Sequence, residues 1–390
     1  MITRGQIQGT SDPEFAACRD AFEANFREGG ERGAACVIYR DGKPVLDLWG
    51  GSADATDQTP WYRNTAVPVF SVTKGISALC ILSQVSKGKI DLDLPLAQYW
   101  PEFAAHGKGN ISVRKALAHQ AGVPLISGLV TIEDLADTAA MAARLAAEPP
   151  LFKPGTAHAY HAITVGWITS ELMRRVTGQT VGNWFRANVA GPLELNIQIG
   201  RGDDAQSPVA AVEVPAEYDT PELDPSSIAA RAISLNGLFP ARMSGLADAM
   251  NDPAMQRVEL AGANGVADAR SLARLYSRAI GGGGEAPLVS EDCVHDARRT
   301  VSSGTPLGQE FAGPTWGAGL LLPWAFQPML GEGSFGHDGA GGSLAFAHAP
   351  SGVSFAYVRN RTGQPGIRDP QVYRVVDALT RILGLSIPTY

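Results

Sequence analysis

The chain has 390 residues, of which 45% are hydrophobic and 18% charged, so it can build a large core. A formal net charge of −7 and the lack of Lys/Arg runs interleaved with aromatic residues argue against a nucleic-acid surface. No stretch reaches the ~18 apolar residues of a membrane span. Met1–Gln6 lacks the apolar core of a signal peptide, and the four cysteines form no CxxC pair. We therefore expect a soluble, cytoplasmic protein that binds neither nucleic acid nor membranes.

The first part of the chain predicts one helix, two strands and a second helix. Apolar residues recur with helical spacing over Phe15–Phe26. Gly33–Trp49 predicts two strands around a turn at Asp41-Gly42. An extended apolar segment, Val67–Phe70, then leads into a strongly apolar helix predicted over Ser71–Ser86.

The middle of the chain is predicted to be mainly helical. Apolar periodicity predicts helices over Val113–His119, Thr131–Ala147, Ala162–Thr177, Val181–Val189 and Ala267–Ile280. The segment Asp203–Asn236 is polar and rich in proline, so we expect it to form a loop.

Strands return near the end of the chain, at Thr315–Leu322, Ser334–Asp338, Ser343–Ala349 and Val353–Arg359. An amphipathic helix is predicted over Asp369–Leu383. This order predicts an α+β fold, in which an antiparallel sheet from both chain ends is flanked by terminal helices and a mainly helical lobe is inserted. We assign residues 1–70 and 295–390 to the α/β lobe and 71–294 to the helical lobe, with the active site between them.

The central chemical motif is Ser71-Val72-Thr73-Lys74, at the start of a predicted helix. Residues three apart on a helix share a face, so Lys74 lies beside Ser71. A serine hydroxyl becomes an effective nucleophile when a neighbouring group takes its proton. The helix N-terminus favours negative charge, and the backbone N–H of Ser71 is a candidate oxyanion donor. Because the helix is so apolar, we expect Lys74 to be buried, and a buried lysine needs a functional reason.

Two further segments can contribute to a site. A turn at Pro154-Gly155 precedes Tyr160, whose phenol can reach a pocket from such a loop. In Phe335–Ser343 a strand leads into a glycine-dense bend, where a substrate can approach the backbone closely. There the backbone N–H of Ala340 is a candidate second oxyanion donor. Taken alone, each pattern is also typical of a packing tyrosine or a plain glycine-rich hairpin.

The order of these motifs resembles class C β-lactamases, D,D-peptidases and the related carboxylesterases, which form the serine β-lactamase-like superfamily. Three flanking stretches are similar to that family's LLxHxSGL, VTGxS…PLGM and GGLxSTxxDLARF segments, namely Ala116–Val123, Val176–Leu193 and Ala261–Leu275. The similarity runs from about Ala34 to the final predicted helix.

The resemblance implies roles for the first two motifs. Ser71 is the nucleophile, Lys74 its activating partner and Tyr160 the general base, with Lys74 lowering the pKa of the phenol. Whether Lys74 or Tyr160 takes the proton stays open. No cofactor and no metal is expected, because His158 and His161 lack the HExxH pattern.

Two positions depart from the β-lactamase pattern. Ala162 stands where the family's tyrosine motif has asparagine, and His337-Asp338-Gly339 stands where its strand motif is Lys-Thr-Gly. In β-lactamases these side chains help to hold the amide and the carboxylate of the drug. An imidazole is mostly neutral at pH 7, and neutral esters need neither group. The departures therefore indicate the esterase branch, the family VIII carboxylesterases, with His337 and Gly339 in the substrate-binding strand.

The sequence thus predicts a carboxylesterase that hydrolyses short-chain neutral esters through an acyl-serine intermediate. The expected partner is a small-molecule ester, with weak β-lactam binding by the same machinery. Three alternatives stay open: a β-lactamase or D,D-peptidase, an acyltransferase with an alcohol acceptor, and an inactive binding protein on this fold. An intact Ser-Lys-Tyr set argues against the last. Acyl chain length, enantiopreference and oligomeric state are not set by the sequence.

Overall fold

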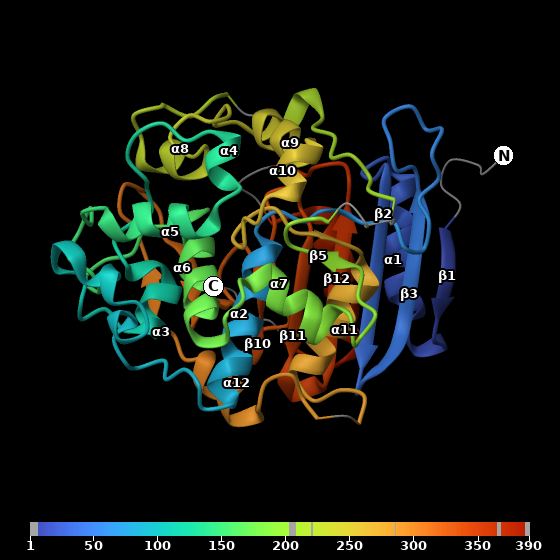
Figure 1. The fold of residues 1–390 in the computed structure, drawn as a ribbon. Coiled ribbons are helices and arrows are strands. Elements are labelled where there is room, and N and C mark those ends of the chain that lie inside the picture. Colours follow the sequence, from blue (N-terminus) through green and yellow to red (C-terminus); the bar gives the residue numbers. More distant parts are fainter. Residues whose placement is uncertain (1–6, 203–207, 220, 285, 365–367, 387–390) are drawn as a thin grey trace.

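The computed structural model describes residues 7–202, 208–219, 221–284, 286–364 and 368–386 (Figure 1). The expected absence of a signal peptide rests on Met1–Gln6, which lies outside these ranges. Nine strands form the main sheet: β1 (Ile7–Ser11), β2 (Gly33–Arg40), β3 (Lys43–Gly51), β7 (Ser302–Gly304), β8 (Gly313–Trp316), β9 (Leu321–Leu322), β10 (Ser334–Asp338), β11 (Leu344–His348) and β12 (Val353–Arg359).

The sheet joins the two ends of the chain. Its order is β1-β3-β2-β12-β11-β10-β9-β8-β7, and each neighbouring pair is antiparallel. The N-terminal strands and the C-terminal strands meet where β2 pairs with β12, and Figure 1 shows blue and red strands side by side there. The predicted α+β class with an antiparallel sheet from both chain ends is confirmed.

Both faces of the sheet are covered. Ala35 and Val37 of β2 join a hydrophobic core on one face, which includes residues of α2 (Val72–Ser86) and α11 (Ala269–Ala279). Cys36 and Ile38 join a second core on the other face, with α1 (Ala16–Arg27) and α13 (Pro370–Ile382). Because successive strand side chains point to opposite faces, a strand covered on both sides reads as one apolar run.

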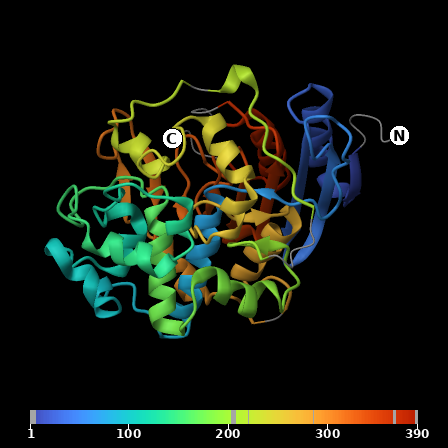
Figure 2. The ribbon, with the colours of Figure 1, turned by 45° about the horizontal axis from the view of Figure 1, so that its top comes forward.

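The remaining helices gather beside the sheet, together with short turns of 3₁₀ or π helix (Figure 2). They are α3 (Val113–Lys115), α4 (Ile132–Leu135), α5 (Thr138–Ala147), α6 (Thr164–Thr177), α7 (Val181–Phe185), α8 (Ile228–Ile233), α9 (Met243–Asn251), α10 (Pro253–Arg257) and α12 (Glu291–Ala297). A small sheet has the order β4-β6-β5, from β4 (Val67–Pro68), β6 (Val266–Ala267) and β5 (Ile197–Gln198). Helix α2 packs against α6, α12 and β10, and it is almost entirely buried.

Three predicted elements are wrong in detail. The helix expected over Thr131–Ala147 is two helices, because the Asp137 carboxylate caps α5 by accepting from the Ala140 N–H at 2.9 Å. The strand expected over Thr315–Leu322 is the antiparallel pair β8 and β9, joined by a bend in which Gly319 has φ +76°.

The segment expected to be a loop, Asp203–Asn236, contains α8, which begins after the capping hydroxyl of Ser227. Its residues 203–207 and 220 are not described. In the described ranges, no helix is both long and apolar enough to span a bilayer. The division into lobes at residues 70/71 and 294/295 stays a prediction.

Candidate active site

Ser71 stands at the junction between strand β4 and helix α2. Phe70 has φ +48°, a left-handed conformation that turns the chain sharply into the helix. The Thr73 hydroxyl donates to the Phe70 carbonyl at 2.5 Å and accepts from the Gly265 N–H at 2.8 Å. This anchors the first turn of α2, whose N-terminal residue Ser71 is partly exposed while the next helical residues are buried.

The Lys74 amine is buried directly beside the Ser71 hydroxyl. Its side chain lies one turn further along α2 and the residue is 5% exposed, with Nζ 3.0 Å from Ser71 Oγ. The amine donates to the carbonyls of Ala162 and Gly262, each at 2.6 Å. Burial lowers the pKa of Lys74 to about 7, and the charge of Asp338 opposes that shift. A neutral amine uses its two N–H bonds on the two carbonyls, which leaves its lone pair for the Ser71 proton.

Tyr160 flanks Ser71 from the other side. Its hydroxyl lies 2.9 Å from Ser71 Oγ, and Lys74 Nζ lies 4.7 Å from the centre of its ring. The expectation that Lys74 lowers the pKa of this phenol is wrong, because burial raises that pKa and the hydrogen bond between Tyr160 and Ser71 only partly opposes the rise. Tyr160 is therefore a protonated phenol at neutral pH, and its O–H is a donor.

An aromatic frame holds the Tyr160 ring. Trp316 of β8 stacks on it with ring centres 5.7 Å apart and planes 15° apart. His119 packs against both rings, 4.9 Å from Tyr160 and 4.4 Å from Trp316. His119 Nδ1 also accepts from the backbone N–H of His161 at 3.1 Å. Sequence reasoning missed Trp316, and it noticed His119 only as part of a family-like segment.

The glycine-rich bend after β10 packs onto the residues that precede Ser71. A Cβ atom at Gly339 would lie 2.3 Å from the Val69 carbonyl oxygen, and one at Gly341 would lie 2.9 Å from the Phe70 ring. In the described ranges the backbone N–H groups of Ser71 and Ala340 donate to no other group. Their service as a paired oxyanion hole stays a prediction.

His337 enters the site as a neutral acceptor. It is 2% exposed, its ring centre lies 5.4 Å from that of Trp316, and burial lowers its pKa to about 3. Its Nδ1 lies 2.6 Å from the Asp338 carbonyl oxygen, so Nδ1 carries the proton. The buried Nε2 is then an acceptor, and it has no hydrogen-bond partner among the residues described. A substrate donor, rather than an oxyanion, would suit this atom.

The two histidines of the HxxH spacing differ in their partners, since backbone groups hold the His161 ring whereas the buried Nε2 of His158 has no hydrogen-bond partner among the residues described. His161 Nδ1 donates to the Ala159 carbonyl at 2.6 Å, and its Nε2 accepts from the Val123 N–H at 3.1 Å. Burial lowers the pKa of His161 to about 4. Across the described part of the chain, no three His, Cys, Asp or Glu side chains are grouped closely enough to hold a metal ion.

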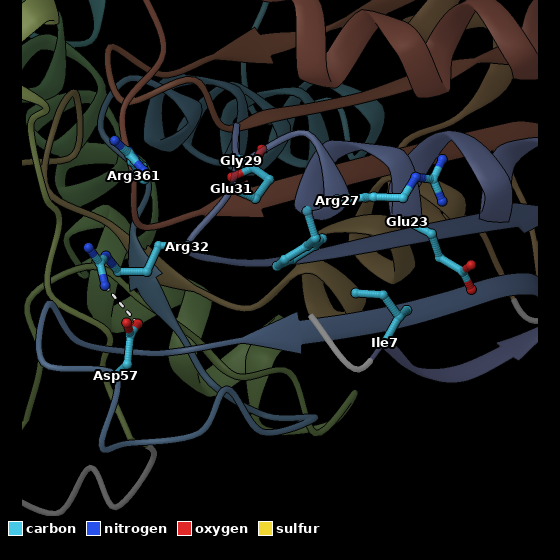
Figure 3. Close-up of a pocket in the computed structure, with 9 residues that line it drawn as sticks. Ile7, Glu23, Arg27, Gly29, Glu31, Arg32, Asp57 and Arg361 are labelled. Atoms are coloured by element: carbon cyan, nitrogen blue, oxygen red, sulfur yellow. Dashed lines mark hydrogen bonds and ion pairs between the residues drawn. The ribbon is translucent and has the colours of Figure 1, made fainter. Parts of the chain in front are cut away.

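A separate pocket of about 670 Å³ lies on the terminal-helix side (Figure 3). Its walls carry mostly charged side chains, and Arg32 pairs there with Asp57 at 2.7 Å. The lining residues are Ile7, Glu23, Phe26, Arg27, Gly29, Glu31, Arg32, Asp57 and Arg361. Because none of them is a serine, lysine or tyrosine, this pocket cannot replace the site around Ser71.

Comparison with known proteins identifies the family of the chain. The family model described as Beta-lactamase matches residues 19–380. The chain belongs to the beta-lactamase family. It is similar to Esterase/beta-lactamase LipL of Mycobacterium tuberculosis, with 35% identity over 371 residues, which cover 92% of this chain and 84% of the relative.

Two solved structures of this family have the same fold. One is a family VIII carboxylesterase, with a TM-score of 0.85 and 33% identity, covering 97% of this chain and 100% of that chain. The other is a penicillin-binding protein homologue from Caulobacter crescentus, with a TM-score of 0.84, 35% identity and the same coverage. The beta-lactamase-like fold is thus confirmed, and the protein is a hydrolase of the serine β-lactamase/esterase superfamily.

The contact between Gly339 and Val69 gives a first prediction. Gly339→Ala places a methyl group against the Val69 carbonyl, so the bend must move away from Ser71. Because small misplacements at a reacting centre are costly, we expect kcat/KM for an ester to fall about 10- to 100-fold. Gly109→Ala is the matched control, since its Cβ would meet only the Ala104 methyl at 3.4 Å. Tm is measured in parallel to detect a loss of stability. Unchanged kinetics for Gly339→Ala would show that the bend is not part of the active site.

Proposed function

We propose that the protein is a carboxylesterase that hydrolyses short-chain neutral esters through an acyl-serine intermediate. The observation that carries this is the position of the Ser71 hydroxyl, 3.0 Å from the Lys74 amine and 2.9 Å from the Tyr160 hydroxyl. One oxygen therefore has a proton acceptor on one side and a proton donor on the other. That arrangement is the requirement for nucleophilic catalysis with acid–base help.

In the acylation step the neutral Lys74 amine takes the Ser71 proton as Oγ attacks the ester carbonyl. The developing oxyanion lies at the backbone N–H groups of Ser71 and Ala340. When the C–O bond to the alcohol breaks, the Tyr160 phenol protonates the leaving alkoxide and regains a proton from the Lys74 ammonium. Water then attacks the acyl-enzyme by the same path in reverse, which releases the acid and restores Ser71.

The choice of esters over lactams rests on two side chains. The position of the amide-binding asparagine is a buried alanine, Ala162, whose carbonyl instead holds Lys74. The position of the lysine that holds a drug carboxylate is His337, which burial keeps neutral. Similarity to an esterase/beta-lactamase and to a family VIII carboxylesterase supports the ester assignment. Because the relative LipL is described as an esterase/beta-lactamase, β-lactam hydrolysis is the second candidate function.

Ser71→Ala should abolish ester hydrolysis while the fold stays intact, because it removes the hydroxyl to which the Lys74 amine is hydrogen-bonded. Lys74→Ala should lower the rate nearly as much, since the effects of substitutions within one catalytic unit are not additive. A fluorophosphonate adduct located by mass spectrometry should lie on Ser71. Ser86→Ala, at the far end of α2, is the control that should keep activity. An adduct on a different serine would contradict the assignment.

The pKa of about 7 for Lys74 sets the pH profile. A protonated amine cannot accept the Ser71 proton, so kcat/KM should rise with pH through about 7 and then level off. Tyr160→Phe should lower the rate about 10²-fold or more without moving that midpoint, because the phenol stays protonated there. Near-wild-type activity, or a midpoint displaced in the Phe variant, would show that the roles of the two residues are misassigned.

Neutral short esters should be turned over far better than β-lactams. The loss of one charge-assisted hydrogen bond to a drug carboxylate costs roughly 1.5–3 kcal/mol, or about 10- to 150-fold in affinity. Steady-state kcat/KM is to be compared for p-nitrophenyl acetate, p-nitrophenyl butyrate, nitrocefin and a penicillin. Slow nitrocefin hydrolysis fits the shared Ser71 machinery. A lactam that equals or exceeds both esters would make the protein a β-lactamase.

A further inference from the structure

Strand β10 ends in a carboxylate, Asp338, that the proposed mechanism does not use. Asp338 is the last residue of β10, and its side chain is 37% exposed. The Gln327 amide donates to Asp338 Oδ2 at 3.0 Å. Gln327 is itself held by the Tyr373 hydroxyl, which donates to its Oε1 at 2.8 Å. The carboxylate is thus fixed by a chain of hydrogen bonds that reaches α13.

Asp338 sits between two residues that contact the Ser71 segment. On one side, a Cβ at Gly75 of α2 would lie 3.4 Å from His337 Cβ, so β10 packs closely on the helix that carries Ser71. On the other side Gly339 packs against the Val69 carbonyl. The charge of Asp338 also acts on both flanking groups, since it raises the pKa of Lys74 and of Tyr160. The carboxylate therefore belongs to the active site and not to a remote surface.

Among the residues that the structure describes, little positive charge balances this carboxylate. Burial keeps the imidazoles of His119, His161 and His337 neutral, because it lowers the pKa of each. Lys74 is the cation whose charge acts on Asp338, and its own pKa of about 7 leaves it largely neutral above that pH.

A second cation, Arg368, is already engaged. Its guanidinium lies 3.9 Å from the centre of the Tyr373 ring and pairs with Asp377. Its two contacts are thus with residues of the terminal helix α13. Burial raises the pKa of Asp338, whereas the hydrogen bond from the Gln327 amide and the charge of Lys74 oppose that rise, and its side chain is 37% exposed to water.

We propose that Asp338 selects substrates by charge, so that the site takes neutral and cationic esters and rejects those carrying a carboxylate near the reacting carbonyl. This proposal rests on the proposed esterase function and adds a repulsive element to it. Histidine in place of the family's lysine at position 337 removes an attraction for a substrate carboxylate. The carboxylate of Asp338 at the next position goes further, because it repels a substrate anion directly. At an effective dielectric constant of about 20 near a protein surface, two like charges about 6–8 Å apart change binding by roughly 30- to 100-fold.

The test uses three phenyl butyrates that differ only in a para group: a carboxylate, a carboxamide or a trimethylammonium. Their intrinsic reactivities differ, so each substrate is compared between wild type and variant, and that difference cancels. Asp338→Asn keeps an acceptor for Gln327 and removes the charge. Asp338→Thr is a second variant that restores the residue type of the family motif. Glu310→Gln, at an exposed loop position, is the matched control for the loss of one carboxylate.

We expect both Asp338 variants to raise kcat/KM for the carboxylate ester about 10-fold or more relative to the carboxamide ester. The trimethylammonium ester should change in the opposite direction, and high salt should shrink both effects in the wild type. Glu310→Gln should leave all three ratios unchanged. A uniform change across the three substrates would overturn the proposal and give Asp338 a role through Lys74 instead. Turnover of the carboxamide ester by the wild type tests the esterase function separately, so the two failures are distinguishable.

Discussion

The rest of the site depends on the burial of one amine between two backbone carbonyls. Lys74 donates to Ala162 and Gly262, which are 88 and 188 residues away in the chain. Without these acceptors, burying the lysine would lower the free energy of unfolding. Without burial, the pKa of Lys74 would stay near 10.5. Gly166 of α6 allows the arrangement, since a Cβ there would lie 2.4 Å from the Gly262 nitrogen. The helical region is therefore what makes Lys74 a base near neutral pH.

The sheet supplies the opposite wall of the site. Because β2 and β12 join the two ends of the chain, β10 is set beside α2 although more than 250 residues separate Ser71 from Asp338. The bend after β10 then packs on Val69 and Phe70, directly before the nucleophile. The pair Ser71 and Lys74, the Tyr160 phenol and the bend come from three distant segments, and the fold fixes their relative positions.

Sequence reasoning succeeded where the signal was local. An apolar run and the SxxK spacing predicted α2 with Lys74 beside Ser71, and β10 and β12 fall where short apolar runs predicted strands. It failed where a single side chain interrupts a periodic stretch, as Asp137 does between α4 and α5. It also missed the acceptors of Lys74, because a backbone carbonyl leaves no mark in the sequence. It missed the stacking of Trp316 on Tyr160 as well, because that contact joins residues far apart in the chain and no local pattern predicts it.

One physical cause gives the two groups beside Ser71 complementary roles. Burial disfavours charge, so it lowers the pKa of the Lys74 amine and raises that of the Tyr160 phenol. Both are then neutral at rest, one as an acceptor and the other as a donor. The alternative resting state, an ammonium beside a phenolate, would bury an ion pair at a desolvation penalty of several kcal/mol per ion. Charge thus arises only as Ser71 gives up its proton, when the oxyanion forms and Lys74 becomes an ammonium.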